Sequence, residues 1–156
     1  MWRSNRHNIY LGIFLAVFNK SVMASDINDC WVRASIEHQV PVRLLKAIGK
    51  VESDYNPKAH EVLAGGSESI GIMQINSFWY KKLEERGISR SDLWEPCINI
   101  NVGAWILKME IDRYGYSWKS TGAYNGGAYS KNNKEKKLKH YAIYADKVYR
   151  AIKQIK

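Results

Sequence analysis

The chain has 156 residues, 46% of them hydrophobic, and carries 24 Lys and Arg against 15 Asp and Glu, which gives a net charge of +9 at pH 7. This length suits one compact domain with its own hydrophobic core. Two cysteines without clustered histidines do not make a zinc site, and the four histidines show no ligand spacing, so we predict that the protein binds no metal.

Residues 1–24 have the pattern of a secretory signal peptide. Basic side chains come first: Arg3, Arg6 and His7. An apolar run follows at 9–18, and residues 22–24 form the small-x-small pattern of a signal-peptidase site. The run is too short for a conventional membrane-spanning helix; the alternatives are an uncleaved anchor or a chance apolar terminus. We expect export and a mature domain at 25–156, which keeps a net charge of +6 because the leader holds three Lys or Arg and no acid.

The mature chain begins with two predicted helices, at 26–39 and 41–53. Asp26 or Asn28 would cap the first helix, and Pro41 suits the first turn of the second.

Glu52, near the end of the second predicted helix, is the most informative residue of the chain. Helical spacing places Leu45, Ile48 and Glu52 on one apolar stripe that should face inward, with Gly49 beside it. Burial and the negative end of the helix dipole both oppose ionisation of a carboxylate. Such a group can hold a proton near neutral pH and deliver it as a general acid. The alternative is a Glu at the edge of the core that pairs with a basic neighbour.

One long irregular segment, at 54–70, separates this helix from the rest of the chain. Turn-forming residues fill the segment, and we expect a loop, with or without a short hairpin. The later predicted elements are a helix at 77–86, a turn at 89–93 and helices at 99–114, 118–124 and 134–155. These patterns predict a mainly α, single compact domain whose longest loop directly follows Glu52.

Cys30 and Cys97 both lie in the expected mature domain. Export into an oxidising compartment makes one disulfide between them the default. Closing a loop of this length would stabilise the fold by about 4 kcal/mol in the chain-entropy model. The alternative is two free, buried thiols.

Five lysines cluster around the start of the last predicted helix: Lys131, Lys134, Lys136, Lys137 and Lys139. Together with the positive mature charge they suit an anionic partner, such as an acidic polymer, a membrane surface or nucleic acid. The predicted signal peptide argues against nucleic acid. The alternative is the solvated start of a helix.

Four short segments carry a resemblance to a known family. They are Glu52-Ser53, Gly71-Ile72-Met73-Gln74, Ala123-Tyr124-Asn125 and Tyr144-Ala145-Asp146-Lys147-Val148. In this order, behind a signal peptide, they resemble the lytic transglycosylases with a goose-lysozyme-like (soluble lytic transglycosylase-type) domain. More narrowly, the chain resembles the small exported members that serve type III secretion, type IV pilus and conjugation machines. The resemblance covers nearly all of the mature chain and implies an α+β, lysozyme-like fold.

The resemblance also implies roles for individual residues. Glu52 would be the single catalytic residue, first as acid and then as base. The implied substrate-binding residues are Ser53, Met73, Gln74, Tyr124, Asn125 and Tyr144. Core packing is the alternative role for Met73 and Tyr144, and helix termination is the alternative for Asn125. Four tryptophans are candidates for stacking on sugars, although more of them are expected in the core: Trp79, Trp94, Trp105 and Trp118.

The stretch at 67–77 also resembles animal-type lysozymes, in which a second carboxylate, an Asp, stands two residues before a Gly. Ser69 holds that place here, and we expect it among the substrate-binding residues. Glu68 is adjacent, but neighbouring residues along a strand point to opposite faces. Asp54, Glu61 and Glu68 all lie in or near the long loop, and each stays a candidate for a second carboxylate.

A single carboxylate suits the transglycosylase route. Glu52 would protonate the oxygen between N-acetylmuramic acid and N-acetylglucosamine, and the acetamido group of the muramic sugar would stabilise C1. Glu52 would then take the proton of the C6 hydroxyl, which closes onto C1 as a 1,6-anhydro end.

We therefore predict a periplasmic peptidoglycan lytic transglycosylase of a Gram-negative bacterium that opens the wall locally for a secretion, pilus or conjugation machine. It would be a monomer without a cofactor. Its partners would be glycan strands and a subunit of the apparatus, with no nucleic acid and no integral membrane segment after processing. The alternatives are a hydrolytic muramidase and a catalytically silent glycan-binding accessory.

Overall fold

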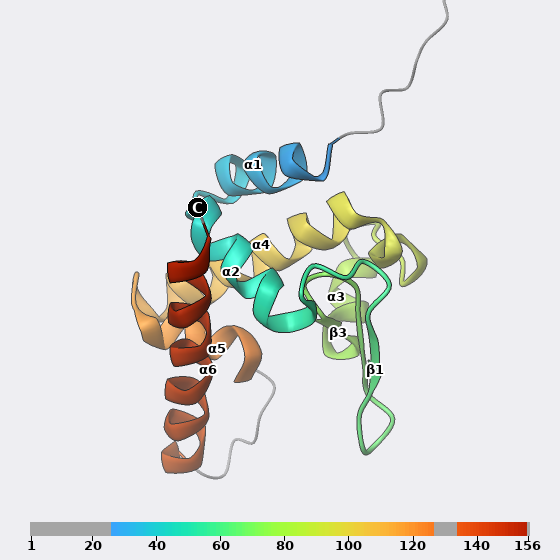
Figure 1. Ribbon diagram of the computed structural model, residues 1–156. Coiled ribbons are helices and arrows are strands. Elements are labelled where there is room, and N and C mark those ends of the chain that lie inside the picture. The colour runs from blue at the N-terminus through green and yellow to red at the C-terminus, as the bar shows by residue number, and fades with distance from the viewer. Residues whose placement is uncertain (1–25, 127–133, 156) are drawn as a thin grey trace, which may run out of the picture.

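The computed structural model describes residues 26–126 and 134–155 (Figure 1). The helices in this part of the chain are α1 (Ile27–His38), α2 (Val42–Ser53), α3 (Tyr80–Glu84), α4 (Pro96–Tyr114), α5 (Trp118–Gly126) and α6 (Lys134–Gln154). Two 3-10 turns accompany them, η1 (Ser77–Trp79) and η2 (Ser91–Trp94), and the strands are β1 (His60–Val62), β2 (Glu68–Ile70) and β3 (Ile75–Asn76). The predicted mainly α fold, with a hairpin after the helix that carries Glu52, is confirmed.

Some predictions concern residues outside these ranges. The signal peptide at 1–24 and Lys131 of the lysine cluster both lie there. In the ranges that are described, no helix combines the length and the apolar character needed to cross a membrane.

Two helices begin well away from their predicted starts. The helix expected at 77–86 begins with a 3-10 turn, because the Asn76 side chain accepts a hydrogen bond from the Phe78 backbone N–H at 3.0 Å and caps that turn. α4 begins at Pro96 instead of Asn99. Proline suits a first helical turn, since the N–H that it lacks has no partner within a helix at that position.

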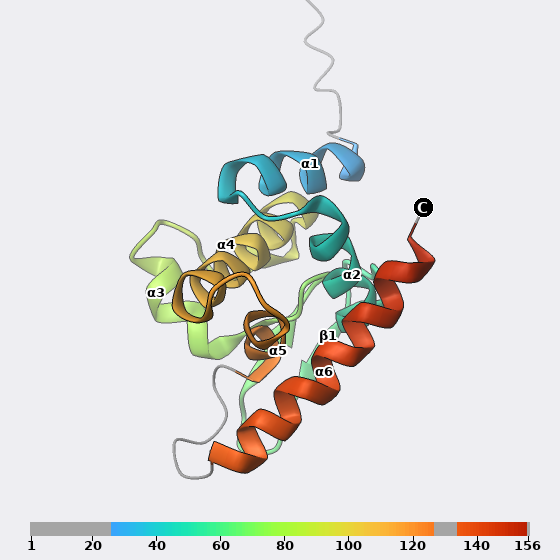
Figure 2. The same cartoon turned by 90° about the vertical axis from the view of Figure 1, so that its left-hand side faces the viewer.

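α4 is the central helix of the molecule. It contacts α1, α2 and α5, while α6 packs along α2 and α5 on one side of the molecule (Figure 2). Fully buried side chains from α2, α4 and the segment between β2 and β3 form the core: Leu45, Ile48, Ile72, Met73, Ile100 and Leu107. Burying each of these side chains stabilises the fold by about 1.5–3 kcal/mol.

A disulfide joins α1 to α4, and a polar link fixes the start of α2 against α6. The predicted disulfide is present: Cys30 of α1 and Cys97 of α4 have Cα atoms 5.0 Å apart. Arg43, at the start of α2, donates through Nη2 to the carbonyls of Ile152 and Ile155 at 3.2 and 2.9 Å. Carbonyls at the end of a helix have no partner within it, so this contact satisfies the end of α6 and fixes α2 against it.

The three strands form one antiparallel sheet in the order β1-β2-β3. Glu61 lies directly opposite Ser69 in the register of β1 and β2. The β1–β2 hairpin projects from the helical body on one side and α6 projects on the other (Figure 1). The space between these two arms contains the candidate site.

Candidate active site

Glu52 lies in the last turn of α2, at the point where the chain turns away. Asp54 and Tyr55 both adopt left-handed backbone conformations, with φ of 51° and 65°. The Tyr55 N–H donates to the Gly49 carbonyl at 3.4 Å, which closes the helix. Lys50 donates to the Asp54 carboxylate at 2.7 Å on the exposed side of this turn. The helix end therefore faces Glu52 inward and Asp54 outward.

Two helices that are distant in sequence donate hydrogen bonds to the Glu52 carboxylate. The hydroxyl of Tyr144, in α6, donates to Oε1 at 2.5 Å, and Asn125 Nδ2, in α5, donates to the same oxygen at 3.5 Å. His140 Nε2 lies 2.8 Å from Asn125 Oδ1 and so orients that amide. The described residues hold no Lys, Arg or His in an ion pair with Glu52, which disfavours the alternative of a paired structural Glu.

Burial raises the pKa of Glu52 from 4.5 to about 7. The hydrogen bonds from Tyr144 and Asn125 act in the opposite direction, because they stabilise the carboxylate. The negative charge of Glu61 raises this pKa further and the positive charge of Lys147 lowers it. At neutral pH the group therefore exists in both protonation states, as a residue that must give and then take a proton requires.

The turn after β2 is fixed by a buried amide. Asn99 of α4 donates to the carbonyls of Ile70 and Leu93 at 2.9 and 2.8 Å and accepts from the Met73 N–H at 2.8 Å. Gly71 has φ of 77°, and a Cβ at this position would lie 2.4 Å from Asn99 Nδ2. Only glycine fits both the backbone conformation and this close approach.

Gln74 follows in the same turn, with φ of 47°. Its side-chain Nε2 donates to the Gly71 carbonyl at 2.9 Å and the Ala59 carbonyl at 3.3 Å, so the amide has a fixed orientation. Ser53 Oγ donates to the Ile72 carbonyl at 2.8 Å, which joins the end of α2 to this turn. Ser53 thus serves the site by positioning the turn beside Glu52.

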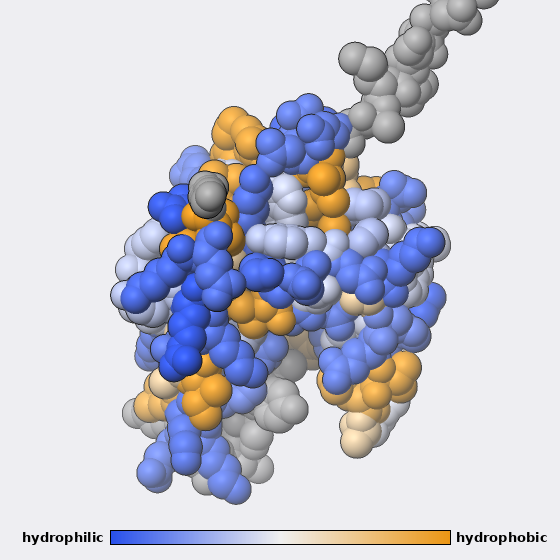
Figure 3. All heavy atoms as spheres, in the orientation of Figure 1, coloured by the Kyte–Doolittle hydropathy of each residue, from blue (hydrophilic) through white to orange (hydrophobic). Residues whose placement is uncertain are grey.

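A cavity of about 580 Å³ opens in front of Glu52, between the hairpin and α6. Glu61, Leu63 and Ser69 line it on the hairpin side, and Asn125 and His140 line it on the other side. Figure 3 shows the hollow between the two arms of the molecule.

Most of the predicted site residues meet at this cavity. Ser69, Gln74, Tyr124 and Asn125 line it together with Glu52. The Ser69 hydroxyl accepts from Asn76 Nδ2 at 3.2 Å. Tyr124 also donates through its hydroxyl to the Met73 carbonyl at 2.9 Å, which ties α5 to the turn.

Three of the expected substrate-binding residues are not among those that line this cavity: Ser53, Met73 and Tyr144. The Met73 side chain is fully buried, and a Cβ at Gly103 would lie 2.7 Å from its Cγ, so this Met packs in the core and only its backbone serves the site. Tyr144 is 5% exposed and acts on the cavity through its hydrogen bond to Glu52.

The three candidate second carboxylates take different positions. Asp54 pairs with Lys50 outside the cavity. Glu68 accepts two hydrogen bonds from Arg90, at 2.6 and 2.8 Å, and the Arg90 guanidinium is the main reason that its pKa falls to about 2. Only Glu61, of these three, lines the cavity.

Two contributors to the site escaped sequence reasoning. Asn99 is a polar residue between two apolar ones in a helix, a pattern that signals a buried amide with backbone partners. His140 gave no signal, because its role depends on a contact between α5 and α6. Of the tryptophans considered for sugar stacking, Trp79 lines the cavity and packs edge-on against Trp105 at a centroid distance of 5.6 Å.

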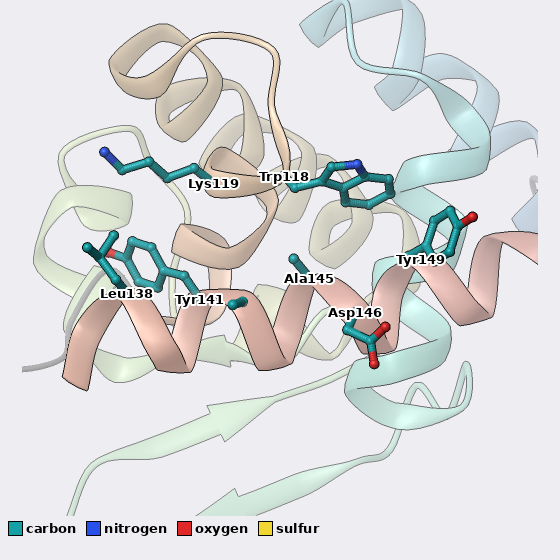
Figure 4. Close-up of a pocket in the computed structure, with 8 residues that line it drawn as sticks. Trp118, Lys119, Leu138, Tyr141, Ala145, Asp146 and Tyr149 are labelled. Carbon is teal, nitrogen blue, oxygen red and sulfur yellow. The ribbon is translucent and has the colours of Figure 1, made fainter. Parts of the chain in front are cut away.

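A second cavity, of about 620 Å³, lies between α5 and the far side of α6 (Figure 4). Trp118, Leu138 and Tyr149 line it, and its carboxylate, Asp146, pairs with Arg150 at 2.9 Å. This carboxylate is exposed and ion-paired, unlike that of Glu52, so the residues that line the second cavity offer no comparable acid. The described ranges contain no group of three or more His, Cys, Asp or Glu that could hold a metal ion.

The sequence is similar to those of known proteins over most of its length. The family described as Transglycosylase SLT domain matches residues 29–147. Protein IpgF of Shigella flexneri is 42% identical over 123 residues, which is 78% of this chain and 78% of IpgF. Invasion protein IagB of Salmonella typhimurium (strain SL1344) is 40% identical over 129 residues, 82% of this chain and 78% of IagB. X polypeptide of Escherichia coli is 30% identical over 147 residues, 94% of this chain and 85% of that protein.

Proposed function

The chain belongs to the transglycosylase SLT domain family and is a peptidoglycan lytic transglycosylase, and from this premise we propose that Glu52 is its catalytic acid and base. The bond that it cuts is the β-1,4 link between N-acetylmuramic acid and N-acetylglucosamine. The observation that carries this proposal is the state of Glu52. It is a half-buried carboxyl with a pKa of about 7 that lines a cleft and accepts two hydrogen bonds from neutral donors.

In the first step, protonated Glu52 gives its proton to the glycosidic oxygen. The bond from C1 of the muramic sugar to that oxygen breaks, and the acetamido oxygen of the same sugar bonds to C1. The hydrogen bonds from Tyr144 and Asn125 both go to Oε1, so we assign the transferred proton to Oε2. The two donors also stabilise the carboxylate that remains, since they favour the charged form.

In the second step, the Glu52 carboxylate takes the proton of the C6 hydroxyl. The C6 oxygen bonds to C1, the bond to the acetamido oxygen breaks, and a 1,6-anhydro end results. Glu52 is protonated again, and no water is consumed. Ser69 supports this route, because it places a hydroxyl where a lysozyme-type nucleophile would stand.

The remaining site residues would bind the glycan strand. Ser69, Gln74, Tyr124 and Asn125 line the cavity and offer donors and acceptors to sugar hydroxyl and amide groups. Trp79 gives an aromatic wall. The positions of these residues on the hairpin, α5 and the turn after β2 would hold one strand across the hollow.

The cellular role is a second layer of the proposal. The predicted signal peptide and the disulfide support export to the periplasm of a Gram-negative bacterium. The resemblance to members that serve secretion, pilus and conjugation machines, and the name of the relative Invasion protein IagB, support local wall opening for such a machine. A monomer that meets a subunit of the apparatus suits this role. Fractionation of cells with a tagged full-length chain tests it: a shortened chain in the periplasm is the expected result, and a full-length chain in the cytoplasm would contradict it.

Product analysis tests the chemistry. Purified peptidoglycan would be digested with the mature chain, and the products compared by mass spectrometry with those of Glu52→Gln. We expect 1,6-anhydro muropeptides from the wild type and a loss on the order of 10²–10⁴-fold in the variant, the usual contribution of a general acid. Reducing-end products would instead indicate a hydrolytic muramidase. Wall binding without any products would indicate a glycan-binding accessory.

A further inference from the structure

The register of the hairpin places a carboxylate beside the position where a lysozyme would have one. Ser69 occupies the lysozyme Asp position in β2, and Glu61 of β1 is its direct cross-strand partner. Directly opposed residues of an antiparallel pair project from the same face of the sheet, with Cβ atoms about 4.5–5.5 Å apart. Both side chains line the cavity in front of Glu52, as this rule requires.

The other face of the hairpin explains why Glu61, and not Glu68, has this position. Glu68 is one residue from Ser69 and projects away from the cavity, where Arg90, His60 and Tyr80 all contact its carboxylate. These contacts fix the hairpin in its register. A slip of one residue would move Glu61 out of the cavity and break the ion pair of Glu68 at the same time.

Electrostatic coupling agrees with this geometry. The charge of Glu61 raises the pKa of Glu52, so the two groups interact across the cavity. Glu61 is exposed, and its carboxylate accepts no hydrogen bond from another described side chain. A glycan strand in the cavity would exclude water between Glu61 and the sugar, and a charge acts more strongly when water is excluded.

We propose that Glu61 is the second carboxylate of this cleft, and that its negative charge stabilises the positive charge that develops at C1 of the muramic sugar. The inference rests on the proposed function of Glu52. Glu61 forms no bond to C1 and moves no proton in this scheme: the acetamido oxygen remains the group that bonds to C1, and the products remain 1,6-anhydro ends. Lysozymes carry this carboxylate at the position that Ser69 holds here. In this chain the neighbouring strand, β1, supplies it instead.

The test compares Glu61→Gln with Glu84→Gln, which removes the same charge from the exposed side of α3, away from the cavity. We expect kcat for 1,6-anhydro product formation to fall about 100-fold in Glu61→Gln, the order of effect of one group that stabilises transition-state charge. KM should change little. Glu84→Gln should match the wild type, and both variants should unfold at the wild-type temperature, because both side chains are exposed.

A pH profile separates electrostatic action from a structural one. Titratable groups from three elements face Glu52. They are Glu61 in β1, Tyr124 in α5, and Tyr144 and Lys147 in α6. Because Glu52 must be protonated to act as an acid, kcat/KM falls as pH rises through its pKa. Removing the like charge of Glu61 should therefore shift this alkaline limb to lower pH.

Moving the carboxylate back across the strand pair gives the sharpest test. Glu61→Gln combined with Ser69→Asp restores a charge at the cross-strand neighbour, and kcat should recover to within about tenfold of the wild type, since one charge replaces the other at the same face. Glu61→Gln with unchanged kcat and an unchanged alkaline limb would overturn the inference. If the wild type itself forms no 1,6-anhydro ends, the proposed function fails first, which is a different outcome of the same assay.

Discussion

At the scale of the residue, Glu52 is kept between acid and base by opposed contacts. Burial favours the neutral carboxyl, while the hydroxyl of Tyr144 and the amide of Asn125 favour the carboxylate. Neither contact brings a positive charge to the group. An ion pair with Lys or Arg would hold a carboxylate ionised at neutral pH and remove its ability to give a proton.

This arrangement reduces stability, and the sign of the effect can be predicted. The pKa of Glu52 is about 7 in the folded chain, whereas 4.5 is the ordinary value that applies in the unfolded chain. Between these two pH values the folded state keeps the proton of Glu52 and the unfolded state has lost it. The contribution of Glu52 to the free energy of unfolding therefore falls as pH rises from 4.5 to 7. Glu52→Gln removes the titration and keeps an acceptor for Tyr144. We expect the variant to be more stable than the wild type by about 3 kcal/mol at about pH 8, and equal to it at about pH 4.

Urea unfolding at the two pH values measures this difference. Glu84→Gln is the matched control, because it removes one carboxylate from an exposed position. A Glu52→Gln variant less stable than the wild type at high pH would contradict the assignment of a raised pKa.

At the scale of the element, the turn after β2 links all parts of the site. Its backbone carbonyls and N–H groups are bound by Asn99 from α4, Tyr124 from α5 and Ser53 from α2. Gln74, which faces the cavity, is part of the same turn. A shift of the turn would therefore move substrate-binding groups and the surroundings of Glu52 together.

Gly71→Ala tests how strongly this turn is fixed. The new Cβ would lie 2.4 Å from Asn99 Nδ2, at a backbone φ of 77°. We expect a loss of about 3 kcal/mol or more in the free energy of unfolding, from strain and from disruption of the Asn99 hydrogen bonds. Gly66→Ala is the matched control: its φ is 83°, and nothing lies within 4 Å of a Cβ there.

The control should lose only about 1–2 kcal/mol, the cost of a left-handed backbone for a residue with a Cβ. Thermal and urea unfolding of both variants give the comparison. Equal losses of unfolding free energy in the two variants would mean that the cost comes from the left-handed backbone alone and that the contact with Asn99 adds nothing.

At the scale of the whole molecule, α4 carries both the disulfide and part of the cavity wall. Its first turn carries the disulfide to α1, and its later turns pack below the cavity, where Ile106 lines the wall. Of the described residues, Tyr144 and Asn125 donate hydrogen bonds to Glu52, and their helices, α6 and α5, carry neither cysteine of the disulfide.

Cys30→Ser with Cys97→Ser should therefore separate stability from activity. We expect the free energy of unfolding to fall by about 4 kcal/mol, as the chain-entropy model gives for a loop of this length. The kcat of the folded fraction should stay at the wild-type value. Urea unfolding, and product assays at a temperature where the variant is folded, check both points. Wild-type protein with its disulfide reduced gives an independent comparison, because it lacks the same bond. A lower kcat in a fully folded variant would show that the disulfide also shapes the cleft.

The sequence by itself determined the features that depend on local order. Helical periodicity was sufficient to place Glu52 on an apolar stripe, turn-forming residues predicted the irregular segment after it, and export made the Cys30–Cys97 bond the default. Periodicity and turn-forming residues depend on neighbours along the chain, so they can be seen in the sequence. The disulfide could be predicted because the expected mature domain contains only two cysteines.

Tertiary structure decided which side chains meet. Asp54, Glu61 and Glu68 all stayed candidates in the sequence, although strand alternation already placed Glu68 on the face opposite Ser69. Strand register, together with Arg90, shows that Glu61 is the one that lines the cavity. The packing of α4 against the turn moved Met73 from the cleft to the core. The contact between α5 and α6 added His140 behind Asn125. Each of these outcomes depends on distances between segments remote in sequence, and a periodic pattern carries no information about those distances.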